Sequence, residues 1–242
     1  MFSLLISLAV GLLFGFGLSL TTGLHPAVYV VVGSIVFMVL YFILMRKIMK
    51  KVSDGVEAAQ RDLMANRPEK AVATIKSVQK QYGPWQFYIK KQMDAQIGII
   101  HYMRRDFNKA YDYLKRGFVR HWIAMGMLGV IYMKRNKIAD MTSTFDKAVA
   151  VTRKEPLLWN LYAYCLDHVG QREKAITVMN KALKKAGNDE RLKANLEALQ
   201  NNKKMKMQVY GDAWYQFHLE KTGAMIRKQT KAIQGRRKIV RR

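Results

Sequence analysis

The side chains best suited to nucleophilic chemistry are Cys165 and His168, which lie three residues apart. On a helix this spacing brings both onto one face, where an imidazole could accept the proton of a thiol. A working pair also needs a third group that orients the base, and the sequence offers none beside it. A cysteine in such an apolar stretch is more often a small buried hydrophobic residue. The sequence also lacks the motifs of phosphate loops, zinc helices and serine elbows, so we expect no enzyme activity, cofactor or metal site.

A second chemically distinctive segment is the basic stretch over residues 203–242. It holds twelve basic and two acidic side chains, a net charge of +10. Tyr210, Trp214, Phe217 and Lys221 are spaced by four, three and four residues, so a helix there would carry an aromatic stripe. Three interpretations stay open: a final helix that packs its aromatic side chains on the rest of the chain, a segment on an anionic membrane surface, and a nucleic-acid-binding tail.

The distribution of charge divides the chain into two kinds of material. Residues 1–45 contain no Lys, Arg, Asp or Glu, so all 42 basic and 17 acidic side chains follow them. The net charge of +25 favours an anionic partner: nucleic acid, anionic lipid or an acidic protein. The chain has a single cysteine, which excludes an intramolecular disulfide.

The uncharged segment predicts a transmembrane hairpin over residues 1–46. Its two spans, residues 2–20 and 27–45, are each long enough at about 1.5 Å per residue to cross the hydrocarbon of a bilayer. Residues 21–26 between them have the composition of a turn and are too few to cross a membrane. Residues 21–26 therefore lie on one side of the bilayer, and the other ends of both spans lie on the opposite side.

The flanking charges predict the orientation of this hairpin. Arg46, Lys47, Lys50 and Lys51 directly follow the second span, whereas the turn carries no Lys or Arg. The positive-inside rule places these residues, and Met1, in the cytoplasm. A cleaved signal peptide is the alternative, but the first span lacks a basic leader and a second full-length span follows.

Small residues recur every four positions along the first span. This period keeps them on one helix face, where the backbone of another helix can approach closely. We expect the face to pack against the second span of the same hairpin, while oligomerisation through the membrane helices stays open. The small residues are Ser3, Ser7, Gly11, Gly15 and Ser19.

From Val52 onward the sequence changes to short amphipathic helices. These helices recur at regular spacing, and Ala71, Ala110 and Ala175 each open one directly after a polar turn. We therefore expect an all-α fold in which an array of helix pairs covers residues 47–202. The segment 188–202 has the pattern of a helix that closes such an array.

This spacing resembles the tetratricopeptide repeat, a helix–turn–helix unit of 34 residues. The clearest copy runs over residues 156–189, and looser copies cover residues 52–90, 91–121 and 122–155. The resemblance implies a solenoid, because no unit can bury its apolar face alone. In the clearest copy the large and small positions of the family are filled in order by Trp159, Tyr162, Ala163, Leu166, Gly170, Ala175, Met179 and Ala182.

The resemblance also implies a concave face that binds a partner. Lys134 and Asn160 match part of the set with which some family members hold a peptide's terminal carboxylate. The full set of groove positions falls on Tyr102, Met103, Val130, Met133, Lys134, Asn160, Tyr164, Asp167 and His168.

Together, the hairpin and the repeats predict a membrane-anchored scaffold that recruits a cytoplasmic partner protein, for which an acidic protein is a candidate. This layout is similar to that of HemY-type bacterial inner-membrane proteins, so we expect a bacterial inner membrane with both termini and the repeats in the cytoplasm. The alternative is a membrane protein that tethers nucleic acid or anionic lipid headgroups through residues 203–242.

Overall fold

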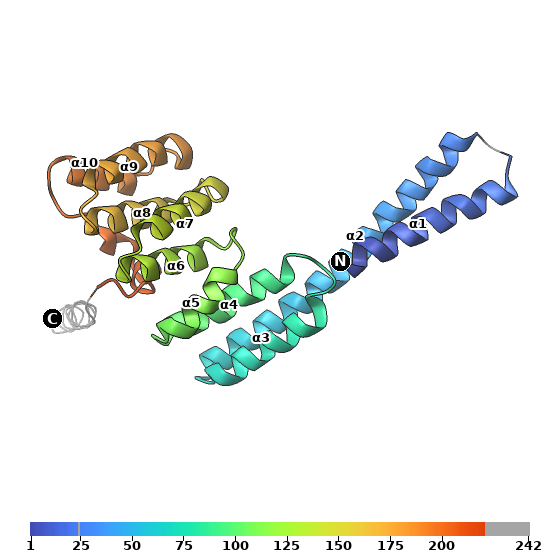
Figure 1. Ribbon diagram of the computed structural model, residues 1–242, viewed down its shortest axis with the longest axis horizontal. Helices are drawn as coiled ribbons and strands as arrows, with labels where there is room; N and C mark the ends of the chain where they lie inside the picture. The colour runs from blue at the N-terminus through green and yellow to red at the C-terminus, as the bar shows by residue number, and fades with distance from the viewer. Residues whose placement is uncertain (24, 221–242) are drawn as a thin grey trace, which may run out of the picture. The chain divides into compact units, whose positions relative to one another are not determined.

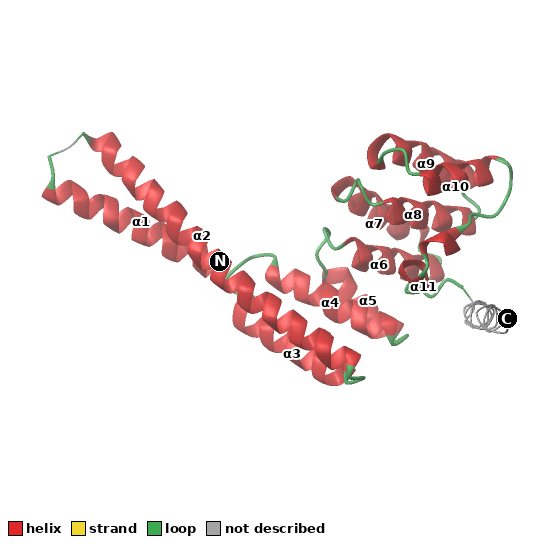
Figure 2. Cartoon of the chain, turned by 180° about the vertical axis from the view of Figure 1, so that it is seen from behind, coloured by secondary structure: helices red, strands yellow, loops and turns green. Residues whose placement is uncertain are grey.

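The computed structural model describes residues 1–23 and 25–220 of this protein. All regular structure in these residues is helical, with no strand, which confirms the predicted all-α class. The chain divides into two compact units, Met1–Ala124 and Met125–Arg242. Figure 1 follows the helices along the chain, and Figure 2 shows them from behind.

Short connections join the helices, and most helices that follow one another within a unit pack as antiparallel neighbours, from α1 to α5 in the first unit and from α7 to α10 in the second. The first unit holds α1 (Phe2–Thr21), α2 (Pro26–Met64), α3 (Pro68–Tyr82), α4 (Ile89–Met103), α5 (Phe107–Arg116) and the start of α6 (Trp122–Lys134). The second unit continues with α7 (Ile138–Val151), α8 (Pro156–His168), α9 (Arg172–Ala186), α10 (Glu190–Gln200), the 3₁₀ helix η1 (Met207–Tyr210) and α11 (Asp212–Tyr215).

Helices α1 and α2 form a hairpin in which glycines let the backbones touch. A Cβ atom added at Gly11 would lie 2.8 Å from the carbonyl oxygen of Gly33, and one at Gly15 would lie 3.0 Å from that of Tyr29. Ser3 and Ser7, on the same face of α1, are also buried, whereas Ser19 is only partly buried. Gly11 and Gly15 thus pack against α2 within the hairpin, whereas Ser3 hydrogen-bonds to the loop between α3 and α4.

Most of the large apolar side chains on this hairpin have no protein to cover them. Leu13 and Val30, for example, are each 70% exposed. Only 17% of the most apolar window of α1, and 6% of that of α2, is buried, so neither segment is a core helix of a globular unit. Both helices are long and apolar enough to cross a membrane.

Helix α2 continues well beyond the apolar segment, as one helix of 39 residues. The hairpin was expected to end at residue 46, but no helix end occurs there. The second half of α2 instead buries Ile48, Val52 and Ala59 in the core that it shares with α3 and α4. The hairpin and the first helix pair are therefore joined through a continuous helix.

The same backbone turn ends α2, α4, α6, α8 and α10. In each, the amide of one residue donates to the carbonyl five positions back, at 2.7–3.0 Å, as Gln171 does to Leu166. The residue just before that donor is left-handed and closes the turn. These left-handed residues are Asn66, Arg105, Asn136, Gly170 and Asn202, with φ between 55° and 80°.

Within three of the helix pairs, a glycine of the first helix faces a large side chain of the second. An added Cβ would lie 2.7 Å from Leu114 at Gly98, and 2.4 Å from Phe145 at Gly129. At Gly55 it would lie 2.4 Å from Val78. The glycines therefore set how closely the paired helices approach.

The packing of α1 on α2 makes a testable prediction. Gly11→Ala should lower the free energy of unfolding in detergent by about 1–3 kcal/mol, because the new methyl group meets the backbone of Gly33. Gly17→Ala is the matched control, since nothing lies within 4 Å of its added Cβ. Equal stability of the two variants, measured by denaturant titration followed by circular dichroism, would contradict this packing.

Candidate functional site

The expected groove residues fall into both units. Tyr102 and Met103 belong to the first unit, where Tyr102 is fully buried and packs edge-on against Phe107 at 5.2 Å. Met103 is 48% exposed. All the other expected groove residues belong to the second unit, and the site described below lies entirely within it.

In the second unit, the residues that follow α10 return to the face of α8 and fill it. The polar part of this contact is a network around Asn160, which is fully buried. The Asn160 side-chain amide lies 2.6 Å from the Tyr210 hydroxyl, and its carbonyl oxygen accepts from Asn195 at 2.8 Å. The side-chain oxygen of Asn195 in turn accepts a hydrogen bond from the backbone N–H of Lys206, with 2.7 Å between oxygen and nitrogen. Two buried amides thus hold an irregular stretch of chain by its backbone and by one side chain.

The apolar part of the contact is made by side chains of this returning segment that reach into the unit. Met207, Trp214 and Phe217 are each at most 2% exposed. Trp214 packs edge-on against Tyr164 with 4.9 Å between the ring centres, and its indole N–H donates to Glu220 at 2.9 Å. We call residues 205–218 the groove segment.

Phe217 fits where α6 lacks a side chain. A Cβ atom added at Gly126 would lie 3.1 Å from the Phe217 ring and 2.9 Å from Leu161. Lys134, also on α6, donates to the backbone carbonyl of His218 at 3.3 Å. Helix α6 thus provides a recess for an aromatic ring and a cation for a main-chain oxygen.

Asp167 and His168 do not contact the groove segment in the described hydrogen bonds and ring contacts. Asp167 accepts two hydrogen bonds from Arg172, at 2.7 and 3.2 Å, and so joins the start of α9 to the end of α8. His168 is exposed and stacks on Tyr164 with 6.1 Å between the rings. Val130 and Met133 are buried in the unit.

Burial determines the titration of the groove tyrosines. It raises the pKa of Tyr210 and of Tyr164 above the ordinary value of a phenol, so both hydroxyls stay protonated near neutral pH. The Arg191 guanidinium lies over the Tyr210 ring, 4.6 Å from its centre, and is oriented by Asp189 at 2.7 Å. The site therefore presents hydrogen-bond donors, aromatic surfaces and cations.

The aromatic residues of the basic stretch are used in this packing. They do not lie on one helix as their spacing predicted, because Gly211 (φ 57°, ψ −134°) separates η1 from α11. Trp214 and Phe217 are buried against the unit, so neither is available to insert into a membrane or stack on bases. Lys221 and all later basic residues of the stretch lie outside the described residues.

Cys165 and His168 do not have the surroundings that nucleophilic chemistry needs. Cys165 is fully buried, and burial raises the pKa of its thiol, which disfavours the reactive thiolate. Among the described residues, no group of three or more His, Cys, Asp or Glu side chains is placed to hold a metal ion.

Sequence reasoning did not identify Asn195 or Gly126. Asn195 follows Leu192 by three residues and precedes Leu199 by four, so it lies on the apolar stripe of α10. A polar residue on such a stripe indicates a buried hydrogen-bonding role, and that signal was present in the sequence. No local pattern distinguishes Gly126, because its role depends on a ring that is far away in the chain.

No family model matches this chain, and comparisons with curated proteins and with solved structures likewise found no match. The candidate site is therefore defined by its own geometry.

The Asn160 network predicts a loss of stability on truncation. Asn160→Ala leaves the Asn195 amide and the Tyr210 hydroxyl without their buried partner, which should lower the free energy of unfolding by about 1–3 kcal/mol. Asn180→Ala, an exposed change on α9, is the matched control and should change the stability by less than about 0.5 kcal/mol. Denaturant unfolding of the full chain in detergent measures both.

Proposed function

We propose that this protein is a membrane-anchored adaptor whose helical-repeat part binds a segment of a partner protein. The hairpin of α1 and α2 would hold it in the bilayer. The basic residues after the apolar part of α2, beginning at Arg46, would face the cytoplasm by the positive-inside rule. The large exposed apolar surface of the hairpin supports this anchoring, since such a surface is unfavourable in water.

Two repeated features support a tetratricopeptide-like array. The first is the left-handed turn that ends every second helix from α2 to α10. The second is a pair of positions sixteen residues apart, small in the first helix and large in the second. Four such pairs are buried: Ala59 and Ile75, Gly98 and Leu114, Gly129 and Phe145, and Ala163 and Met179.

The observation that carries the proposal is the occupancy of the groove. Three of the residues that the family resemblance assigns to a binding groove, Lys134, Asn160 and Tyr164, contact the groove segment. Much of this segment is irregular, and it is held through amide groups, a cation and aromatic anchors. These are the means by which a groove binds a peptide.

The groove segment also indicates what the partner would look like. Its anchors, Met207, Tyr210, Trp214 and Phe217, are spaced by three, four and three residues. A partner segment with large apolar or aromatic side chains at similar spacing could replace it. Lys134 and Arg191 border the site, so acidic residues beside those anchors would favour binding.

A cleavable form of the full chain tests whether the groove accepts a peptide. A specific protease site is inserted between Lys203 and Lys204, before the first contact of the groove segment. After cleavage, a fluorescent peptide with the sequence of residues 204–220 should bind the protein, and it should not bind the uncut chain. The Trp214→Ala form of the peptide should bind about tenfold or more weakly, since it loses a buried aromatic anchor.

The same peptide also tests whether the groove recruits a partner protein to membranes. Full-length Trp214→Ala, which loosens the groove segment, should retain more of a partner than the Asn180→Ala control, and the free 204–220 peptide should release that partner. If cleavage frees the groove segment and the peptide still does not bind, the groove is not a peptide site and the proposal is wrong.

A further inference from the structure

The loop between α3 and α4 is fastened to the start of α1. The hydroxyl of Ser3 donates to the backbone carbonyl of Trp85 at 2.9 Å and accepts from the Gln86 side chain at 2.8 Å. The backbone N–H of Phe2 donates to the carbonyl of Pro84 at 3.2 Å. Ser3 is fully buried and Gln86 is 4% exposed, so these polar groups satisfy one another.

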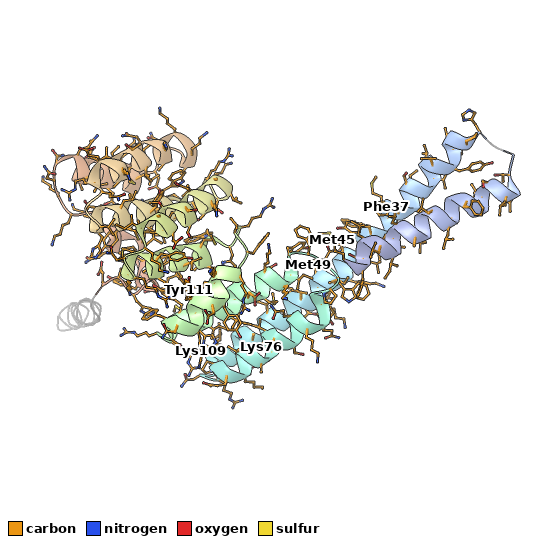
Figure 3. The ribbon with its side chains drawn as sticks, in the orientation of Figure 1. Phe37, Met45, Met49, Lys76, Lys109 and Tyr111 are labelled. Carbon is orange, nitrogen blue, oxygen red and sulfur yellow. The ribbon has the colours of Figure 1, made fainter. Side chains whose placement is uncertain are left out.

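The packing of the hairpin shows where along α2 this attachment occurs. The added Cβ of Gly11 lies nearest to Gly33 and Phe37, and that of Gly15 lies nearest to Tyr29 and Gly33, so the numbers of facing residues add up to between 44 and 48. Continuing the antiparallel pairing down the hairpin brings Ser3 opposite the turn of α2 that ends at Met45. Met45, labelled in Figure 3, is the last residue before the first charge of the chain. The loop therefore lies at the end of the apolar segment.

The side chains of this loop suit the boundary between hydrocarbon and water. Trp85 packs edge-on against Phe2 at 6.0 Å, and Phe87 is 66% exposed. The hydroxyl of Tyr88 lies 3.2 Å from the sulfur of Met49, which ties the loop to the next turn of α2. Tryptophan and tyrosine are enriched at this level of membrane proteins, and an exposed phenylalanine there can enter the lipid.

A pocket of about 640 Å³ opens beside this loop. Lys47, Lys50 and Lys51 line it from one face of α2, and Tyr82 and Trp85 line it from the other side. All three lysines are exposed, and none forms an ion pair with another described residue. Neither the Tyr82 hydroxyl nor the Trp85 indole N–H has a hydrogen-bond partner among the described residues.

We propose that this pocket binds the headgroup of an anionic phospholipid. The inference rests on the membrane anchoring in the proposed function. The lysines, together with the free hydroxyl and indole donors, would surround a phosphate that bears one net negative charge. The acyl chains would then extend along the apolar surface of the hairpin, which begins at the same level.

Asp54 also lines the pocket, one turn of α2 beyond the lysines. Its carboxylate would repel a free polyanion. It could accept a hydrogen bond from a hydroxyl or ammonium group of the lipid's headgroup alcohol. That alcohol lies on the side of the phosphate away from the acyl chains. This arrangement favours a phosphodiester with a donor beyond it, as in phosphatidylglycerol, over inorganic phosphate.

Titration of the full chain with short-chain lipids in neutral detergent tests the site. Short-chain phosphatidylglycerol, followed by native mass spectrometry, should bind at least about tenfold more tightly than phosphatidylcholine of the same chain length. Replacing Lys47, Lys50 and Lys51 together by Gln should weaken its binding about tenfold or more. Replacing the exposed α9 residues Lys181, Lys184 and Lys185 by Gln removes the same charge and should leave the affinity within twofold. Lys50→Gln alone, a single surface change, should weaken binding about threefold or more.

Three results would overturn the lipid site: equal affinity for the two lipids, equal affinity of the two triple variants, or binding of inorganic phosphate or glycerol 3-phosphate as tight as that of the lipid. Alkaline carbonate extraction of membranes that carry the full chain distinguishes these three results from a failure of the proposed membrane anchor. Release of the protein by carbonate contradicts the membrane anchor itself. Retention by the membrane with no effect of the three pocket lysines contradicts the lipid site alone.

Discussion

Helix α2 has to satisfy two environments along one uninterrupted axis. Its first half is apolar and largely exposed beyond its contact with α1, and its second half supplies one side of the first helix pair. Because no turn separates the halves, the hairpin and the first helix pair cannot move independently as a tethered domain would. The attachment of Ser3 to Trp85 and Gln86 adds a second link between them.

This continuity accounts for where the aromatic loop and the basic pocket lie. The loop after α3 can reach the start of α1 because α3 runs back along α2 toward the end of the apolar segment. The pocket lysines follow the first charge, Arg46, on the same helix, and they line the pocket opposite the aromatic side chains of Tyr82 and Trp85. The apolar hairpin, the aromatic loop and the cationic pocket thus lie next to one another because of one long helix and one polar attachment.

The second unit poses a different physical problem, since the face of α8 that we propose as a binding groove is covered by the chain's own groove segment. Burying Trp214, Phe217 and Met207 stabilises this arrangement by about 1.5–3 kcal/mol for each side chain. The groove segment is also tethered within a few residues of α10, which gives it an advantage in effective concentration over any partner. A competing partner would therefore need better anchors, or a high local concentration at the membrane.

Much of this organisation could be predicted from the sequence. The uncharged first 45 residues predicted both apolar helices, and the recurring alanines and polar turns predicted the helix pairs. The continuation of α2 was not predicted, because Arg46 was interpreted as a boundary although Arg and Lys are good helix formers. A helix would have carried Tyr210, Trp214 and Phe217 as one aromatic stripe, but Gly211, with a positive φ, separates η1 from α11. Asn160 was expected in the groove, while its partners Asn195 and Tyr210 lie too far along the chain for any local pattern to connect them.

The most direct test of the account is residue-resolved hydrogen exchange of the full chain in a bilayer. The amide of Lys206 donates to Asn195, so it should exchange many times more slowly than in an unstructured peptide. The amides of Trp214 and Phe217 should be protected with it, since both donate within the groove segment. If these amides exchange at unstructured rates while α8 and α10 stay protected, the groove segment does not bind the second unit. The claim that this unit holds a peptide-like segment is then wrong.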